Sequence, residues 1–149
     1  MVAAAGVRPG ELVLDLGAGH GALTAHLVRA GARVVAVELH PRRAEALRQR
    51  FPGITVLQAD ATEIRLPGRP YRVVANPPYG ISADLLRALL APGSGLVAAD
   101  LVLQRAVVRR YAGGSWRRFS VTAGLMLPRR AFLPPPQVDS AVLVIRRRR

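Results

Sequence analysis

Short apolar runs alternate with helix-like segments through residues 1–110, and this alternation limits the possible folds more than any other feature of the sequence. The runs are almost continuously apolar, which is typical of strands buried on both faces of a sheet. Strands and helices that alternate at this spacing form a parallel sheet with helices on both faces. The predicted strands cover residues 12–16, 33–38, 54–57, 71–75 and 96–103. The predicted helices cover residues 22–30, 41–50 and 82–90, and a fourth helix starts near Arg105. Ser82 is expected to cap the helix at residues 82–90.

The last part of the sequence departs from this pattern. Residues 119–127 and 141–145 have the composition of strands, but only a loop containing Pro134–Pro136 lies between them. Without a crossover helix, the two strands are expected to pair antiparallel and to close the sheet. The prediction is therefore a single α/β domain spanning residues 1–149.

The net charge of +13 comes entirely from arginine, because the 22 basic residues include no lysine. Residues 1–75 carry ten arginines and six acidic residues, a net charge of +4, whereas residues 76–149 carry twelve and three, a net charge of +9. A positive half of this kind favours a polyanionic partner such as nucleic acid, and an ordinary solvated basic surface is the alternative.

Composition also excludes several classes of protein. The chain has no cysteine, which rules out disulfides and thiolate metal sites, and His20, His26 and His40 do not have the spacing of metal ligands. No apolar run reaches the roughly 20 residues of a membrane span, and no secretory signal is visible. We therefore expect a cytoplasmic protein with neither a metal nor a membrane partner.

A glycine-rich loop follows the first predicted strand, in the sequence Gly17-Ala18-Gly19-His20-Gly21-Ala22. Glycines at the start of a helix allow a tight turn and a close approach of the backbone to a ligand. Glu38 ends the next strand, 21 residues after Gly17, where a carboxylate can accept from both hydroxyls of a ribose. Asp60 follows the third strand and can accept from an adenine amino group, and Asp15 can take a ligand amino group or remain a buried acid. Together these residues indicate an adenosine cofactor, either NAD or S-adenosylmethionine.

Asn76-Pro77-Pro78-Tyr79 directly follows the predicted strand at residues 71–75. Two consecutive prolines end the strand and restrict the residue before each of them, so the turn is stiff. The Asn76 side chain and the Pro77 carbonyl are then fixed acceptors at the carboxyl end of a parallel strand, where ligands bind in open α/β sheets. Two acceptors beside an aromatic ring suit a planar exocyclic amine, and hydride transfer has no use for them. This loop therefore favours S-adenosylmethionine over NAD.

The motifs occur in the order found in the rRNA adenine N6-methyltransferases, which this chain resembles over nearly its whole length. The resemblance rests on the segments Leu14–Thr24, Val37-Glu38, Gln58-Ala59-Asp60, Asn76–Ser82 and Phe132–Ala141. It is nearest to the Erm-type macrolide-resistance enzymes, with the KsgA-type small-subunit enzymes as close relatives, and the last of these segments is specific to those two groups. The resemblance implies a Rossmann-like class I methyltransferase fold, with a mostly parallel seven-stranded sheet and an antiparallel last strand.

The resemblance also implies the roles of individual residues. S-adenosylmethionine is expected to bind at Asp15, Gly17, Ala18, Gly19, Gly21, Glu38, Asp60, Ala61 and Asn76. The target adenine is expected to be held by Asn76, Pro77, Tyr79 and Phe132, with the two aromatic rings stacked on the base. The implied reaction is methyl transfer to N6 of one adenine in 23S rRNA, of the macrolide–lincosamide–streptogramin B resistance type, by a monomeric enzyme.

Arginines after Asp100 are the candidate contacts to RNA. This stretch holds eleven arginines and one acidic residue, with Trp116 next to two of the arginines. Basic residues beside an aromatic residue fit contacts to phosphates together with stacking on bases, although Trp116 is equally suited to a core position. The predicted RNA-binding residues are Arg105, Arg109, Arg110, Arg117 and Arg118.

Two departures from the family pattern leave other hypotheses open. The Gln-Asn-Phe-type segment at the start of these enzymes and the helical lobe at their end are not found in this sequence, so we expect a catalytic core alone. Pro77 stands where the family more often has isoleucine or leucine, and proline is closer to the DNA adenine and protein-glutamine methyltransferases. A KsgA-type 16S rRNA enzyme, a DNA adenine N6-methyltransferase and a non-catalytic RNA-binding protein on the same fold remain the alternatives.

Overall fold

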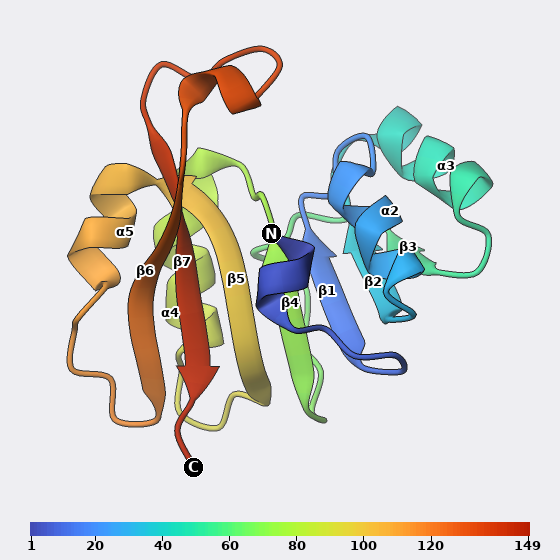
Figure 1. The fold of residues 1–149 in the computed structure, drawn as a ribbon. Helices are drawn as coiled ribbons and strands as arrows, with labels where there is room; N and C mark the ends of the chain where they lie inside the picture. Colours follow the sequence, from blue (N-terminus) through green and yellow to red (C-terminus); the bar gives the residue numbers. More distant parts are fainter.

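The computed structural model describes residues 1–149, which form one seven-stranded sheet with helices on both faces (Figure 1). The strands are β1 (Leu12–Leu16), β2 (Arg33–Val37), β3 (Thr55–Leu57), β4 (Tyr71–Ala75), β5 (Leu96–Gln104), β6 (Phe119–Leu127) and β7 (Ser140–Arg147). Their order in the sheet is β3-β2-β1-β4-β5-β7-β6. Strands β1 to β5 pair in parallel, whereas β7 runs antiparallel to both of its neighbours, β5 and β6.

Helices cover the two faces of the sheet unequally. They are α1 (Val2–Ala5), α2 (Ala22–Arg29), α3 (Pro41–Arg50), α4 (Ser82–Leu89) and α5 (Arg105–Tyr111), with short 3₁₀ helices η1 (Tyr79–Ile81) and η2 (Arg129–Ala131). Because successive side chains of a strand point to opposite faces, β1 shows which helices lie on which side. Val13 packs with Leu27 of α2 on one face, whereas Leu14 belongs to the cluster that contains Leu86 of α4 on the other.

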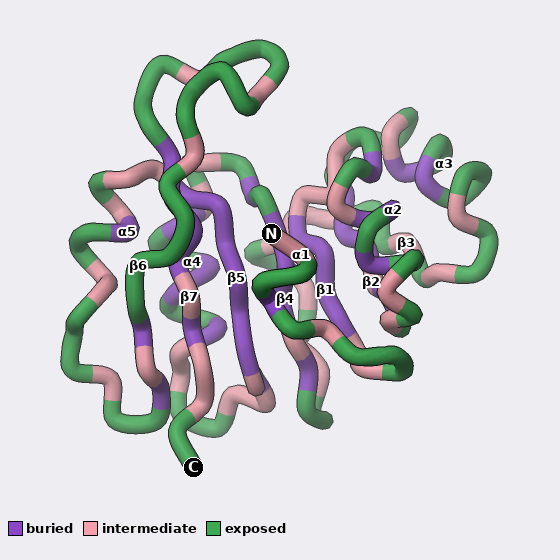
Figure 2. Tube along the Cα trace, in the orientation of Figure 1, coloured by how far each residue is buried: buried purple, intermediate pink, exposed green.

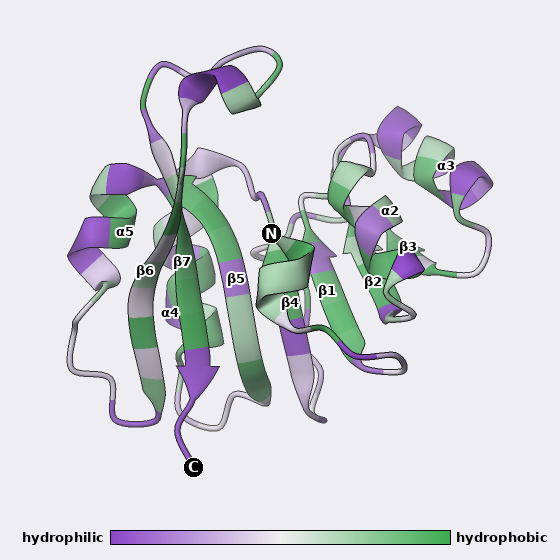
Figure 3. Ribbon diagram, in the orientation of Figure 1, coloured by the Kyte–Doolittle hydropathy of each residue, from purple (hydrophilic) through white to green (hydrophobic).

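The main hydrophobic core lies between the sheet and helices α4 and α5, and it contains 19 buried residues. Strand β5, next to the central strand β4, is buried along almost its whole length (Figure 2). The strands are also the most apolar elements, whereas α3 and the outer side of α5 are polar (Figure 3). Full burial of one leucine side chain is worth roughly 1.5–3 kcal/mol, so the continuously apolar runs stabilise a strand only where both faces are covered.

The predicted α/β class, the seven strands and the antiparallel last strand are confirmed, with strand ends correct to within two residues. One local prediction was wrong, because Ser82 does not cap α4. Ser82 is itself the first helical residue, and its hydroxyl donates to the Tyr79 carbonyl at 3.0 Å. The turn η1 therefore runs directly into α4, and the serine closes that turn instead of the helix end.

A partly buried ion pair joins β7 to β5. Arg146 donates from Nη1 to Asp100 Oδ2 at 2.9 Å and from Nη2 to Asp100 Oδ1 at 3.1 Å. The Asp100 side chain is 5% exposed and the Arg146 side chain 35% exposed. Two parallel hydrogen bonds between guanidinium and carboxylate give directional as well as electrostatic stabilisation, so this pair fixes the position of β7 beside β5.

Parallel strands place their carboxyl ends at one edge of the sheet, where open α/β sheets bind ligands. The loops that follow β1 to β4 lie at this edge, and the β6–β7 loop, residues 128–139, rises above it (Figure 1). Residues that precede the parallel strands lie at the opposite, amino edge. None of the helices has the length and apolar composition required to cross a bilayer.

Candidate active site

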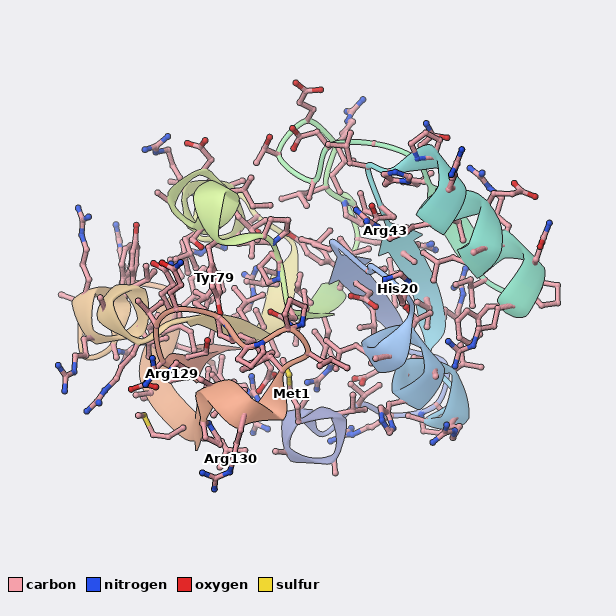
Figure 4. All side chains as sticks on the ribbon, turned by 90° about the horizontal axis from the view of Figure 1, so that it is seen from above. Met1, His20, Arg43, Tyr79, Arg129 and Arg130 are labelled. Atoms are coloured by element: carbon pink, nitrogen blue, oxygen red, sulfur yellow. The ribbon has the colours of Figure 1, made fainter.

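A cavity of about 540 Å³ opens at the carboxyl edge of the sheet. Its volume is within the roughly 300–1,000 Å³ typical of small-molecule sites. Figure 4 looks down on this edge, with Tyr79 on one side and Arg43 and His20 on the other. The lining includes nine residues that the sequence predicted for the site: Gly17, Gly19, Glu38, Asp60, Ala61, Asn76, Pro77, Tyr79 and Phe132.

The glycine loop touches the Asn-Pro-Pro-Tyr loop. Gly17 has a φ of +76°, and a Cβ built on it would lie 2.8 Å from Cδ of Pro78, so a side chain there would be both strained and obstructed. Gly19 also has a positive φ, +58°, but nothing lies within 4 Å of a Cβ built there. Because Gly19 lines the cavity, this open space allows a ligand to approach the backbone of the loop.

Glu38 connects the glycine loop to the start of α3. Its Oε1 accepts from the Gly19 N–H at 2.8 Å, and its Oε2 accepts from the His40 N–H at 2.8 Å. Arg43 Nε lies 3.4 Å from the same Oε2. Each carboxylate oxygen has two acceptor lone pairs, so Glu38 can hold the loop and still accept from ligand hydroxyls. The same carboxylate can therefore hold the start of α3 and still bind a ribose.

Asp60 lines the cavity with one carboxylate oxygen already engaged. Oδ1 accepts from the Thr62 N–H at 2.9 Å and from the Thr62 hydroxyl at 2.7 Å. These hydrogen bonds, the backbone one foremost, hold the pKa of Asp60 below its usual value. The remaining oxygen, Oδ2, makes no hydrogen bond within the chain and is available to accept from a ligand amino group.

The two acceptors after β4 are also available. Asn76 is exposed, and its side chain makes no hydrogen bond within the chain. The Pro77 carbonyl likewise accepts no backbone hydrogen bond. Both residues therefore line the cavity beyond the end of β4, and their role as acceptors stays a prediction.

Two aromatic residues from distant parts of the sequence line the same cavity. Tyr79 comes from η1 and is half-buried, and its hydroxyl lies 2.6 Å from Ser140 Oγ. Phe132 follows η2 in the β6–β7 loop and is also half-buried. The structure thus brings both predicted aromatic residues to the cavity that Asn76 lines.

Three of the predicted cofactor residues, Asp15, Ala18 and Gly21, do not line the cavity. The Ala18 N–H donates to the Val37 carbonyl at 3.0 Å, which holds the glycine loop against the end of β2. Gly21 precedes α2 with a φ of +91°, and a Cβ there would lie 2.9 Å from atoms of Leu47 and Phe51. Gly21 therefore allows close packing of α3.

The predicted RNA-binding arginines are not gathered around the cavity. Arg105 begins α5 at the carboxyl edge, and Arg109 and Arg110 are exposed farther along that helix. Arg117 and Arg118 are exposed but precede β6, and β6 runs in the same direction as β5, so they lie at the amino edge. These roles stay predictions, and a single RNA surface around the cavity cannot include all five residues.

Trp116 has a core position instead of a free stacking face. Its ring stacks on Tyr111 with centroids 5.8 Å apart, and its Nε1 donates to the Tyr111 carbonyl at 3.2 Å. It also packs against the main core. Of the two interpretations of this residue, the structure supports the packing one.

Two residues that line the cavity, Leu39 and Arg43, lie outside every motif of the sequence. Leu39 follows Glu38, lines the cavity and is 63% exposed; a large apolar residue in an otherwise polar turn before Pro41 was the available signal. Arg43 lines the same side, and no sequence feature distinguishes it from the other arginines of α3.

Asp15 is almost fully buried beneath the glycine loop, with 1% of its surface exposed. Its Oδ2 accepts from the Thr24 hydroxyl at 2.7 Å. Burial, opposed by the Thr24 hydrogen bond and assisted by the charge of Glu38, raises the pKa of Asp15 to about 6. Asp15 is therefore placed as a buried acid that changes its charge near neutral pH.

This raised pKa predicts a pH-dependent stability. The unfolded chain ionises Asp15 near its usual pKa of 3.8, and the folded protein near 6. Asp15 therefore contributes fully to the free energy of unfolding below pH 3.8. About 3 kcal/mol of this free energy is lost as the pH rises through the folded pKa of about 6. Asp15→Asn stays neutral and can still accept from Thr24. In urea unfolding the variant should match the wild type in acid and exceed it above pH 7, and parallel pH profiles for the two proteins would contradict the prediction.

The family model for "Ribosomal RNA adenine dimethylase" matches residues 1–149 of this chain. Mycinamicin-resistance protein MyrB of Micromonospora griseorubida is 38% identical over 146 residues, which cover 91% of this chain and 47% of that protein. Ribosomal RNA small subunit methyltransferase A of Leifsonia xyli subsp. xyli is also 38% identical, over 165 residues that cover 96% of this chain and 59% of that protein. The chain thus spans about half the length of the curated relatives that it matches.

Solved structures share this fold. The 23S rRNA methyltransferase ErmE superposes with a TM-score of 0.88 and 33% sequence identity, covering 98% of this chain and 65% of that one. A dimethyladenosine transferase from Plasmodium falciparum superposes with a TM-score of 0.83 and 25% identity, covering 99% of this chain and 59% of that one. Because the family model matches every residue and relatives above 30% identity cover more than 90% of the sequence, the chain belongs to the ribosomal RNA adenine dimethylase family.

Proposed function

We propose that this chain is the catalytic domain of an S-adenosylmethionine-dependent enzyme that methylates N6 of an adenine in 23S rRNA. One observation carries the proposal: a single cavity joins the acceptors Asn76 and Pro77 and two aromatic residues to the glycine loop and Glu38. The family supports rRNA as the substrate. Greater similarity to ErmE than to the Plasmodium dimethyladenosine transferase supports 23S rRNA.

The residues on the β1–β3 side of the cavity fit S-adenosylmethionine. The open space over Gly19 allows close approach to the backbone, and Glu38 has lone pairs for the ribose hydroxyls. Asp60 Oδ2 can accept from the adenine amino group, and the exposed Leu39 offers an apolar wall to the ring. When bound, S-adenosylmethionine supplies an electrophilic methyl group.

The β4 side of the cavity suits the substrate amine. The N6 lone pair of adenine is delocalised into the ring, so this nitrogen is a poor nucleophile. The Asn76 side-chain oxygen and the Pro77 carbonyl accept the two N6–H groups, which shifts electron density towards nitrogen and orients its lone pair. The nitrogen becomes acidic once it is methylated and then releases its proton to water, so no side chain needs to act as a base beforehand.

Tyr79 and Phe132 provide faces for the target base. An adenine must leave its stack in the RNA to enter the cavity, and each aromatic face restores roughly 1–3 kcal/mol of stacking. Nothing at the cavity reads a base sequence, so selection of one adenine depends on the shape of the RNA around a splayed base.

The second candidate is methylation of 16S rRNA, because the Leifsonia small subunit methyltransferase is as similar in sequence as MyrB. To distinguish them, the protein is incubated with methyl-labelled S-adenosylmethionine and, separately, protein-free 23S rRNA, 16S rRNA and duplex DNA. We expect label in N6-methylated adenine at one site of 23S rRNA. Label in 16S rRNA alone or in DNA alone would contradict the 23S assignment, and no label in any of them would favour a non-catalytic RNA-binding protein.

A further inference from the structure

Ser140, the first residue of β7, is fully buried and contacts the site through one hydrogen bond. Its Oγ lies 2.6 Å from the hydroxyl oxygen of Tyr79, 61 residues away in the sequence. Neither side chain makes another hydrogen bond within the chain. The bond therefore joins Tyr79, which lines the cavity, to the start of β7.

The backbone of Ser140 is rigidly held, which makes it a suitable anchor. It pairs with Gln104 of β5 on one side and with Leu127 of β6 on the other. Tyr79, in contrast, lies in a single 3₁₀ turn after two prolines and is only half-buried. Contacts to the strand thus limit the rotation of a ring that the turn alone does not hold.

We propose that Ser140 is a positioning residue that fixes the orientation of the Tyr79 ring toward the target adenine. This inference rests on the proposed function and deepens it. In this role the ring of Tyr79 supplies the contact to the base, and its hydroxyl, bonded to Ser140, orients the ring. The position of the Tyr79 ring then depends on the position of the first residue of β7.

The neighbouring Asp139 does not provide an equivalent side-chain anchor. Its Oδ1 lies 3.6 Å from Arg129 Nε, and both side chains are at least half exposed, so this ion pair contributes little. Its carbonyl accepts from the Arg105 N–H at 2.9 Å, which does not depend on the side chain. The positioning role therefore belongs to Ser140.

Two single variants and their combination test the proposal. Ser140→Ala and Tyr79→Phe should each lower kcat for methyl transfer by roughly 3- to 10-fold, the effect of one neutral hydrogen bond. The dissociation constant for S-adenosylmethionine should not change. The double variant should be no slower than the slower single variant, because both changes remove the same bond. Since Tyr79→Phe keeps the ring, wild-type activity in that variant, or additive losses in the double variant, would overturn the proposal.

A second tyrosine–serine pair in the chain provides a matched control. The Tyr71 hydroxyl lies 3.3 Å from Ser94 Oγ, and both residues lie at the amino edge, away from the cavity. Tyr71→Phe should leave kcat unchanged, although it also removes a hydrogen bond from a buried ring. Equal losses of activity in this control and in Tyr79→Phe would show a general effect on the fold and would contradict positioning.

A spectroscopic measurement separates this inference from the proposed function. The chain has three tyrosines, so NMR with ¹³C-labelled tyrosine can follow the Tyr79 ring individually. Ser140→Ala should shift and broaden the Tyr79 ring signals but not those of Tyr71 or Tyr111. Unchanged Tyr79 signals would overturn the positioning role whether or not the protein methylates RNA, whereas absence of methyl transfer by the wild type would contradict only the proposed function.

Discussion

Asn76→Ala is expected to lower methyl transfer to rRNA by about 100- to 1,000-fold and to weaken binding of S-adenosylmethionine far less, because Asn76 is only one of the several residues expected to hold the cofactor. Loss of one preorganised polar group that stabilises a transition state typically has an effect of this size. The Asn76 side chain makes no hydrogen bond within the chain, so its removal does not disturb the fold. Glu38 and Asp60, on the other side of the cavity, keep their acceptors for the cofactor.

Asn76→Asp is the matched variant, because it keeps an acceptor oxygen of the same reach. It should retain more activity than Asn76→Ala. Single-turnover rates with saturating cofactor measure the transfer step, and calorimetry measures cofactor affinity separately. Near wild-type turnover by Asn76→Ala would refute the mechanism, since no other side chain at the end of β4 offers an equivalent acceptor.

Asp100→Ala is expected to lower the free energy of unfolding by about 3 kcal/mol. Removal of one partner from a buried ion pair typically destabilises a protein by about 3–5 kcal/mol, because the other charge is left uncompensated. The lower end applies here because the Arg146 side chain is 35% exposed. Since Arg146 also donates to the Ala99 and Ile145 carbonyls, the arginine stays between the strands after its partner is lost.

Asp84→Ala provides the control for this experiment. Asp84 pairs with Arg87 at 3.1 Å on α4, but the two side chains are 64% and 79% exposed. Exposed pairs contribute about 1 kcal/mol or less, so this variant should unfold at nearly the urea concentration that unfolds the wild type. Similar stability of the Asp100 and Asp84 variants would show that the β5–β7 ion pair does not hold the sheet together.

Much of the fold was predictable because the determining interactions are local or periodic. The runs that became β1, β2 and β4 are apolar at nearly every position, and only a strand covered on both faces uses such a pattern. Pro77 and Pro78 end β4 by their own covalent geometry, so the position of the two acceptors followed from four residues. Gly17 was informative for the same reason, since its positive φ is a backbone requirement.

The parts that could not be predicted depend on which strands become neighbours. No periodicity places β7 between β5 and β6, yet this order pairs Ser140 with Gln104 of β5 and brings it to Tyr79. Arg43 lines the cavity only because α3 begins beside Glu38. Contacts of this kind arise from tertiary packing, and the composition of each segment alone does not show them.

The place of β7 in the sheet also bears on the order in which a growing chain is completed on the ribosome. Until residues 140–147 emerge, β6 has no partner and β5 has an open edge. The glycine loop and Glu38 follow strands β1 and β2, which are synthesised earlier and can already pair. The hydrogen bond from Ser140 to Tyr79 forms only when β7 is present, and β7 also fixes the second end of the loop that carries Phe132. A nascent chain can therefore bring the glycine loop and Glu38 together before Tyr79 and Phe132 reach their final positions. The residues expected to hold the adenine would then come together in one step, when β7 pairs, and not gradually as the chain lengthens.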